Sequence, residues 1–473
     1  MTEPTRQTRC LAGRRTSDTF TMVTNSPVAE PKPVLSKSIL KRFAVNVASL
    51  FSVHVANFLL PLLTVPYVVR IIGPERLGLL NFSQAYVAYF SLLINYGFDM
   101  AAVRSIAANR TDKEATDRIF SEVMAGKALL FGLSTAVFIG VSLGNAQFSE
   151  HLFLHVCTYI TCLGTVLSPF WLYQAMEDLG RVAIFNLAVK ILFSLSVFLF
   201  IRQADDYVFQ NLSISVSQVL INVVALYVAM RRFRVRFAWP SVARLIARFR
   251  ADSTLFFSSV MITIYASSNV FFLGLLSSAY NVGIFSAGTR LEGIARSFVA
   301  LALNQAFFPI VASAFGQGRE SGLRVVRTAF VPLCVLMVGV SIGLWVIAPY
   351  FITLFYGDKF GDAVQVLRIV SLLPITIGIS NLLGIHTMLN LRMDRAFFVI
   401  TAIGSVIGLG LNVVLIQQMG HIGAAYAWVL AELYTVGAMY GYLRYKGIHI
   451  INREHVREAV QFGRARVAGL LPK

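Results

Sequence analysis

Charged residues are scarce in this chain, and acidic residues are the scarcest. Of its 473 residues, 14% are charged and 23 are Asp or Glu, whereas 56% are hydrophobic. A soluble globular domain usually carries about 25% charged residues, so this composition excludes an ordinary soluble fold. Together with a mean hydropathy of +0.69, it indicates a polytopic membrane protein.

Cysteine is also rare, and the four cysteines are not arranged as a framework. They show neither a C-x-x-C pair nor a Cys/His metal spacing. Three of them lie inside apolar segments, where a free cysteine packs as a small hydrophobic side chain. We expect no disulfide, no metal and no cofactor. The four are Cys10, Cys157, Cys162 and Cys334.

Motifs of nucleotide chemistry and of common hydrolases are missing. The sequence contains no P-loop, no G-x-G-x-x-G in a βαβ setting, no H-E-x-x-H and no G-x-S-x-G. We therefore do not expect ATP-driven transport by this chain alone. The net charge of +18 would suggest nucleic acid only on a soluble basic fold with interleaved aromatic residues. No such domain is visible, so we expect no nucleic acid partner.

Long apolar runs, in contrast, are abundant. A helix needs roughly 20 apolar residues to cross a bilayer, and twelve such runs predict an all-α membrane protein with two six-helix lobes around a central cavity. They lie near 43–69, 78–101, 119–144, 150–173, 181–201, 208–230, 253–277, 283–310, 325–350, 363–390, 395–416 and 422–443.

Basic residues in the connections predict the orientation. One side of the membrane has 32 Lys and Arg, and the other has four. The positive-inside rule then places both termini in the cytoplasm, which agrees with an even number of spans. Contact with anionic membrane lipids is a natural consequence.

The predicted domains follow from this count. A disordered cytoplasmic tail (1–42) precedes an N-lobe (43–230), a basic cytoplasmic linker (231–252), a C-lobe (253–443) and a basic cytoplasmic tail (444–473). Whether translation starts at Met1 or Met22 stays open. A weak internal repeat places Gly78 over Gly283, and Gly180 over Asp394, which favours a duplicated six-helix unit.

A one-sided polar stripe runs along the second span. At 100° per residue its members fall within an arc of about 80°, so the stripe faces protein or water and not lipid. Ser83 lies off this stripe, and a serine can bond back to its own helix. The alternative reading is that the stripe only hydrogen-bonds to neighbouring helices. Its members are Asn81, Gln84, Ser91, Asn95 and Asp99.

Six charged side chains lie near the middle of predicted spans. An unpaired charge there costs at least roughly 2.5–3.5 kcal/mol for Lys, Arg or Asp, which favours a function for them. Glu292 and Arg296 are four residues apart, so an ion pair within one helix is the alternative for these two. Arg290 has no acidic residue three or four positions away. The six are Lys127, Lys190, Arg290, Glu292, Arg296 and Glu432.

These residues predict a hydrated, cationic cavity and an anionic substrate. The candidate substrate-binding residues are Arg290, Arg296, Lys190, Lys127, Asn81, Gln84, Asn95 and Asp99. The candidates for ion coupling or gating are Glu292, Glu432, Asp99 and His54, although a buried core histidine is the simpler reading of His54. Pro61, Pro66, Pro169 and Pro374 are expected to kink or hinge their helices.

Two classes of function fit this pattern. A transporter needs only the spans and their polar lining. A membrane glycan polymerase or ligase also uses embedded arginines, but it usually presents an extended outer loop, and the longest outer connection predicted here is 350–362. An ion-coupled exporter of another amphipathic substrate is a further alternative.

Three stretches carry a family resemblance. They are WLYQAMEDLGRVAIFN (171–186), GPERLGLLNFSQAYVAYFSLLINYGFDMAAVRSIA (73–107) and YNVGIFSAGTRLEGIARSFVALALNQAFFP (280–309). They resemble the polysaccharide transporter family, the Wzx-type flippases of the multidrug/oligosaccharidyl-lipid/polysaccharide exporter superfamily. The most telling pattern is W-L-Y-Q-x-x-E at Trp171, Gln174 and Glu177, although Ala175 stands where that family usually has glycine. The resemblance covers about residues 43–445.

The resemblance implies a function that is not an enzyme's. It implies that the protein turns an undecaprenyl-diphosphate-linked oligosaccharide from the cytoplasmic to the periplasmic leaflet of a bacterial inner membrane by alternating access. Lipid-linked oligosaccharide and membrane lipids would be its partners, with a polysaccharide polymerase and export proteins as further candidates. The identity of the glycan, the coupling ion and the oligomeric state stay open.

Overall fold

The computed structural model describes residues 37–108, 112–301, 303 and 307–450. Residues 52–450 belong to one compact unit, and residues 37–51 belong to another, for which helical conformation is all that is described. Most of both predicted tails, both candidate start codons and Cys10 lie outside the described residues. The side chain of His54 also lies outside this description.

The chain is helical, and no strand occurs within the described ranges. The elements are α1 (Lys37–Asn95), α2 (Phe98–Ala108), α3 (Lys113–Gly144), α4 (Ala146–Ser149), α5 (Leu152–Leu167), α6 (Phe170–Ala175), α7 (Leu179–Phe200), η1 (Ala204–Tyr207), α8 (Val208–Arg232), α9 (Val242–Leu276), α10 (Ala279–Leu301), α11 (Phe308–Gln317), α12 (Arg319–Tyr356), η3 (Asp358–Phe360), α13 (Ala363–Val370), α14 (Leu373–Leu383), η4 (Gly384–Met388) and α15 (Asp394–Tyr445).

The predicted spans fall on these helices, and the protein is an all-α polytopic membrane protein. Eight helical stretches among the described residues are long and apolar enough to cross a membrane. Two very long elements each contain a kink that separates two expected spans: α1 at Gly73, with φ 76°, and α15 at Gly420, with φ 55°. A positive φ is readily adopted only by glycine, so each kink occurs at a residue that permits it.

The second span differs from the prediction of one continuous helix. Helix α1 ends at Asn95 and α2 begins at Phe98, because Tyr96 (φ 47°) and Gly97 (φ 78°) both leave the helical region. The backbone of α9 approaches closely here, since a Cβ on Gly97 would lie 3.0 Å from the Cβ of Leu255. The polar stripe is therefore interrupted, and Asp99 lies on a different helix from the rest of it.

Two of the four predicted proline bends coincide with helix breaks, whereas α1 stays helical through Pro61 and Pro66. Pro169 lies between α5 and α6, and Pro374 is in the first turn of α14, just after the break that follows α13. Proline lacks an N–H group and clashes with the preceding turn, so it often ends or bends a helix, although α12 runs on through Pro332 and Pro349. After α14 the chain makes a π-helical turn, η4, a feature that often marks functional sites.

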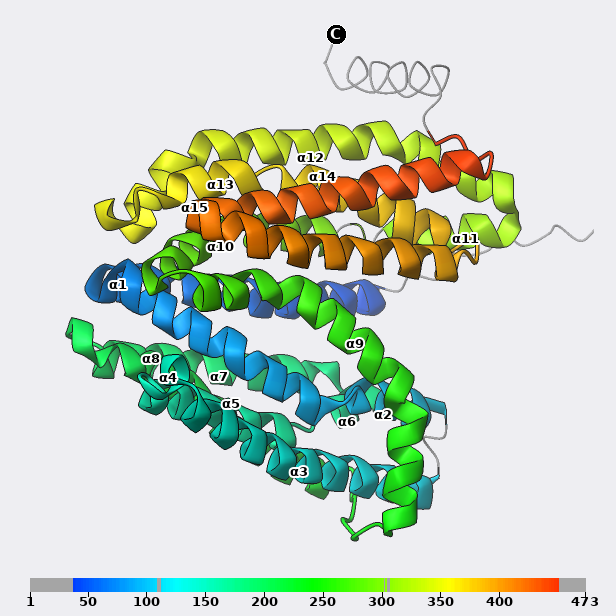
Figure 1. Ribbon diagram of the computed structural model, residues 1–473. Helices are drawn as coiled ribbons and strands as arrows, with labels where there is room; N and C mark the ends of the chain where they lie inside the picture. The colour runs from blue at the N-terminus through cyan, green and yellow to red at the C-terminus, as the bar shows by residue number, and fades with distance from the viewer. Residues whose placement is uncertain (1–36, 109–111, 302, 304–306, 451–473) are drawn as a thin grey trace, which may run out of the picture. The chain divides into compact units, whose positions relative to one another are not determined.

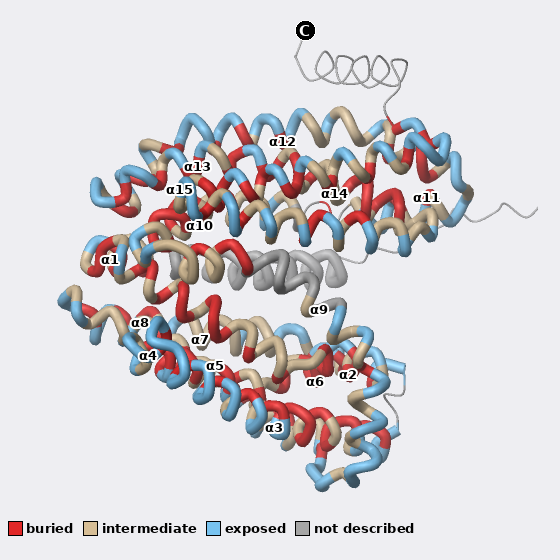
Figure 2. The backbone as a smooth tube through the Cα atoms, viewed as in Figure 1, coloured by how far each residue is buried: buried red, intermediate tan, exposed pale blue. Residues whose placement is uncertain are grey.

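Within each lobe the helices pack side by side (Figure 1). In the N-lobe α5 lies along α8, α7 also contacts α8, and α2 contacts α3 and α6. In the C-lobe α15 contacts α9 and α14, and α10 contacts α13. Exposed apolar residues recur along helices such as α12, where Figure 2 shows pale-blue segments alternating with tan and red ones. Val335, Ile342 and Val346 of this helix are each more than half exposed. Such a surface suits contact with lipid.

The two lobes contact each other through a reciprocal pair of glycines. A Cβ added to Gly78 of α1 would lie 1.7 Å from the carbonyl oxygen of Ala279, and one added to Gly283 of α10 would lie 1.9 Å from the carbonyl oxygen of Pro74. The sequence repeat that aligns Gly78 with Gly283 also aligns Pro74 with Ala279. The contact of Gly78 with Ala279 is therefore repeated, with the lobes exchanged, by the contact of Gly283 with Pro74. Such a repetition is expected around an approximate two-fold axis.

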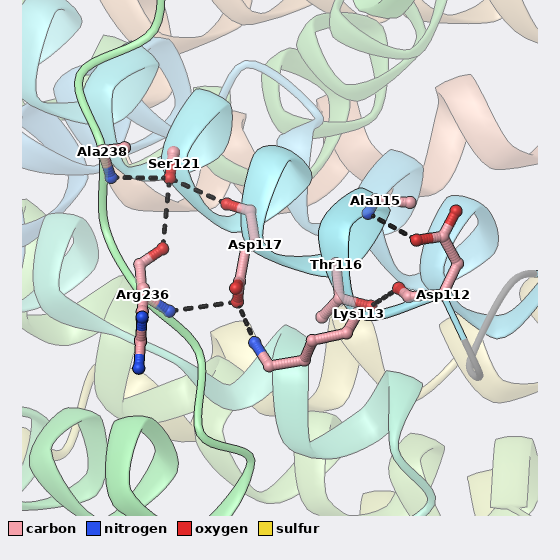
Figure 3. A network of polar contacts seen from close by, with 8 residues as sticks. All are labelled: Asp112, Lys113, Ala115, Thr116, Asp117, Ser121, Arg236 and Ala238. Carbon is pink, nitrogen blue, oxygen red and sulfur yellow. Dashed lines mark hydrogen bonds and ion pairs between the residues drawn. The ribbon is translucent and has the colours of Figure 1, made fainter.

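The connection between the lobes is hydrogen-bonded to α3 through residues 236 and 238 (Figure 3). The backbone N–H of Arg236 donates to the Asp117 carboxylate at 3.0 Å, and the N–H of Ala238 donates to the Ser121 hydroxyl at 3.0 Å. Helix α3 is itself started by Asp112, whose carboxylate caps the N–H of Ala115. The second half of the predicted linker then forms the first turns of α9.

Candidate functional site

A buried polar network joins α1, α5 and α8 inside the N-lobe. The Ser83 hydroxyl donates to Thr158 at 2.8 Å and lies 3.0 Å from a ring nitrogen of His155. The amide of Asn211 donates to Thr158 at 2.9 Å and accepts a hydrogen bond from Gln84 at 2.7 Å. Ser83 and Asn211 are fully buried, so this network holds three helices together.

The network includes one of the five residues of the predicted stripe. The Gln84 side chain is used in the network, and the Asn81 side chain donates to the Leu77 carbonyl of its own helix at 2.9 Å. The geometry of Gln84 agrees with the packing alternative, whereas Asn81 contacts only its own helix in this way. Ser83, which the helical projection places off the stripe, bonds across helices and not to its own helix. The buried Oδ1 of Asn95 has no hydrogen-bond partner within the described residues.

Lys127 and Asp99 form an ion pair between α3 and α2. The Lys127 ammonium lies 2.7 Å from the Asp99 carboxylate and 3.4 Å from the carbonyl oxygen of Thr165. The Lys127 side chain is fully buried, whereas that of Asp99 is 35% exposed. The charge of Lys127 is therefore already compensated. Substrate binding by either residue stays a prediction, and this geometry gives them a structural role first.

Lys190 and Arg290 bring two positive charges together from different lobes. Lys190 is half-buried on α7, Arg290 is exposed on α10, and their charges lie close enough to repel each other. Arg290 also lies near Tyr356. Within the described residues, no carboxylate forms an ion pair with Arg290. Two like charges held at mid-span are a suitable place for an anion.

The remaining predicted residues meet in the C-lobe. Glu292 and Arg296 form the ion pair that is the alternative reading of these two residues, with Arg296 Nε 3.0 Å from Glu292 Oε1. The Arg296 guanidinium also lies over the Trp428 ring, 5.4 Å from its centroid. Both Arg296 and Trp428 line a cavity of about 230 Å³ together with Glu432. A coupling or gating role for Glu292 and Glu432 stays a prediction.

Several of these groupings could not be read from the spans alone. The structure separates the candidates into the Lys127–Asp99 pair, the Lys190–Arg290 pair and the C-lobe cavity. It adds Trp428 and Asn381 to the cavity, which the sequence analysis missed. A signal was present for Trp428, because it lies four residues before Glu432 and therefore on the same face of α15.

Comparisons with known proteins give the family of this chain and its fold. A family model described as "Polysaccharide biosynthesis protein" matches residues 43–315, which is more than half of the chain. The chain belongs to this family. Two curated relatives are each named "Putative O-antigen transporter". The one from Escherichia coli (strain K12) is 26% identical over 405 residues, which cover 84% of this chain and 96% of the relative. The one from Shigella dysenteriae is 24% identical, covering 82% and 96%.

Solved structures of this fold are found among transporters. The lipid II flippase MurJ in an inward closed conformation has a TM-score of 0.64 at 13% identity, covering 83% of this chain and 87% of that one. An inward-facing multidrug resistance transporter of the MATE family has a TM-score of 0.65 at 16% identity, covering 82% and 94%. At these identities the likeness shows the fold of this family member, a multi-pass membrane transporter fold.

Proposed function

We propose that this protein is a flippase that turns an undecaprenyl-diphosphate-linked oligosaccharide across a bacterial inner membrane by alternating access of its two lobes. Membership of the polysaccharide biosynthesis family and the similarity to two proteins named as O-antigen transporters support this proposal. The helices form a transporter fold. Both termini lie in the cytoplasm in this proposal, as the distribution of basic loops predicts.

The observation that carries the proposal is Arg290, an arginine at mid-span that forms no ion pair with a carboxylate of the described residues and whose charge acts on Lys190 of the other lobe. A lipid-linked diphosphate carries negative charge that hydrocarbon does not solvate, so a flippase must supply compensating charge within the membrane. Arg290 can hold two phosphate oxygens through its planar guanidinium, whereas Lys190 contributes a point charge. Because these residues belong to different lobes, a diphosphate between them would offset their repulsion and link substrate binding to the arrangement of the lobes.

Graded changes of Arg290 test this proposal in cells. Arg290→Lys keeps the charge and loses the fork, so glycan export should fall partly. Arg290→Ala should lower export further, and Arg290→Glu should abolish it. The readout is surface glycan per membrane-resident flippase, with accumulation of lipid-linked oligosaccharide inside as a second readout.

Arg368→Ala is the matched control. Arg368 is another exposed arginine of the C-lobe, but its guanidinium stacks on Trp345 at 4.7 Å on the lipid-facing part of α12. Its loss should leave export nearly unchanged. Normal export by Arg290→Glu would remove the Lys190–Arg290 pair from the substrate path.

A further inference from the structure

The C-lobe cavity between α10, α14 and α15 is chemically different from the Lys190–Arg290 pair. Its walls combine two aromatic rings, Trp428 and Phe397, with the polar side chains of Asn381, Thr401 and Glu432. Its volume is about 230 Å³. A small space with one apolar side and a few convergent polar groups is the usual form of a small-molecule site.

The charges in this cavity argue against a phosphate ligand. Arg296 is already compensated by Glu292, to which it is hydrogen-bonded at 3.0 Å, and it lies over the Trp428 ring. Glu432 is 3% exposed, and it forms no ion pair or side-chain hydrogen bond within the part of the chain that the structure describes. The ionisable group without a partner is therefore acidic, and it offers a diphosphate no positive charge.

The polar groups of the cavity mostly need hydrogen-bond donors. A carboxylate such as that of Glu432 accepts only. The hydroxyls of Thr401 and Thr435 donate to carbonyl oxygens of their own helix, at 2.8 and 3.0 Å, which leaves their lone pairs free. The Asn381 side chain can donate and accept, and it has no partner within the described residues. The matching ligand brings several O–H groups on a neutral frame.

The apolar side of the cavity completes the match. A sugar ring has a face of C–H groups, which packs on an aromatic ring, and a rim of hydroxyls, which suits carboxylate and amide groups. The indole N–H of Trp428 is buried without a partner in the described residues, so the ring, and not the N–H, is what Trp428 contributes to the cavity. The wall that contains Asn381 leads directly into the π-helical turn η4, and such turns often accompany binding sites.

We propose that this cavity is a carbohydrate subsite that holds one neutral sugar residue of the transported oligosaccharide, with its ring on Trp428 and its hydroxyls on Glu432 and Asn381. The proposal rests on the proposed function and adds to it that two separate sites bind the two parts of the substrate. The Lys190–Arg290 pair would hold the diphosphate, and the C-lobe cavity would recognise the glycan.

Binding of free sugar separates this proposal from the flippase function itself. The probe is the oligosaccharide released by mild acid from the undecaprenyl diphosphate of the bacterium that makes the protein. Its binding to the purified full-length protein in lipid nanodiscs is measured by equilibrium dialysis. We expect Trp428→Leu and Asn381→Ala each to weaken binding by about tenfold, the effect of one good contact. Trp428→Phe keeps a ring and should bind within about threefold of the parent protein.

Two controls make the result specific. Trp345→Leu removes the other tryptophan that stacks under an arginine, and it should leave sugar binding unchanged. Arg290→Ala should keep binding of the free oligosaccharide while it loses binding of undecaprenyl diphosphate without sugar. Glu432→Gln should weaken sugar binding. If Glu432→Gln instead binds sugar normally but flips the lipid-linked oligosaccharide poorly, Glu432 serves ion coupling, and its role in sugar binding is overturned.

Two outcomes would overturn the subsite. One is free-oligosaccharide binding by Trp428→Leu and Asn381→Ala as tight as that of the parent protein. The other is a parent protein that flips the lipid-linked oligosaccharide without binding the free sugar, which would leave the flippase function standing. A parent protein that does neither would overturn both proposals.

Discussion

A methyl group placed at the contact between the lobes should disfavour the state in which that contact is closed. In Gly78→Ala, the new Cβ would lie 1.7 Å from the Ala279 carbonyl oxygen, whereas ordinary contact begins at 3.4 Å. The backbones of α1 and α10 would have to separate by the difference, about 1.7 Å, or the lobes would have to part. Overpacking of this kind typically costs about 1–3 kcal/mol, which shifts a two-state equilibrium about 5–150-fold.

The assay uses a cysteine placed on α10 next to the contact between Gly78 and Gly283. With the native cysteines replaced, Ser286→Cys lies three residues further along α10 from Gly283. In the proposed orientation this end of α10 is periplasmic, so a membrane-impermeant thiol reagent added from that side should label Cys at 286 faster when Gly78→Ala is present. Glycan export per membrane-resident molecule should fall severalfold.

A glycine outside the contact provides the control. A Cβ added to Gly132 of α3 would meet no atom within 4 Å, so Gly132→Ala should change neither labelling nor export. Export and labelling by Gly78→Ala at the level of the parent protein would refute the reasoning that this contact closes one side of the transporter.

Three further predictions concern the N-lobe and the topology. Asp99→Leu should destabilise the protein by about 3 kcal/mol, at the low end for a broken buried pair, because it leaves the fully buried Lys127 without its partner. The double variant with Lys127→Met should regain most of the melting temperature in detergent. A double variant as unstable as Asp99→Leu would contradict the pairing. Asp117→Ala with Ser121→Ala removes both side chains that accept hydrogen bonds from residues 236–238. Limited proteolysis in inverted vesicles should then cleave this connection faster than in the parent protein. Unchanged cleavage would show that other contacts hold it. Cysteine accessibility should place residues 231–252 in the cytoplasm and residues 145–149 outside, and the opposite result for either loop would reverse the proposed direction of transport.

Much of the fold could be predicted from the sequence because membrane spans have a local signal. Each span is a continuous apolar run, and Pro169 and Pro374 mark breaks through their own covalent structure. The repeat that aligns Gly78 with Gly283 could also be found from the sequence, because it needs only the comparison of two short stretches. That the two glycines contact each other could not, because their contact depends on how two distant helices cross.

The site could be predicted only as a set of residue types. Charges at mid-span identified Lys127, Arg290 and Glu432, because embedded charge is costly wherever its partner lies. The partner of Lys127, Asp99, lies 28 residues earlier in the sequence. The pair Lys127–Asp99 exists because Tyr96 and Gly97 turn the chain out of the helix, and a positive φ at a tyrosine has no clear sequence signal.

The most direct test of the flippase account is reconstitution of the full-length protein into liposomes that contain undecaprenyl-diphosphate-linked oligosaccharide. The rate at which the glycan becomes accessible to an impermeant glycosidase on the opposite side measures flipping. We predict a rate well above that of protein-free liposomes for the parent protein and for Arg368→Ala, and a rate at the protein-free level for Arg290→Glu. Flipping by Arg290→Glu at the parent rate, or no acceleration by the parent protein, would contradict the account.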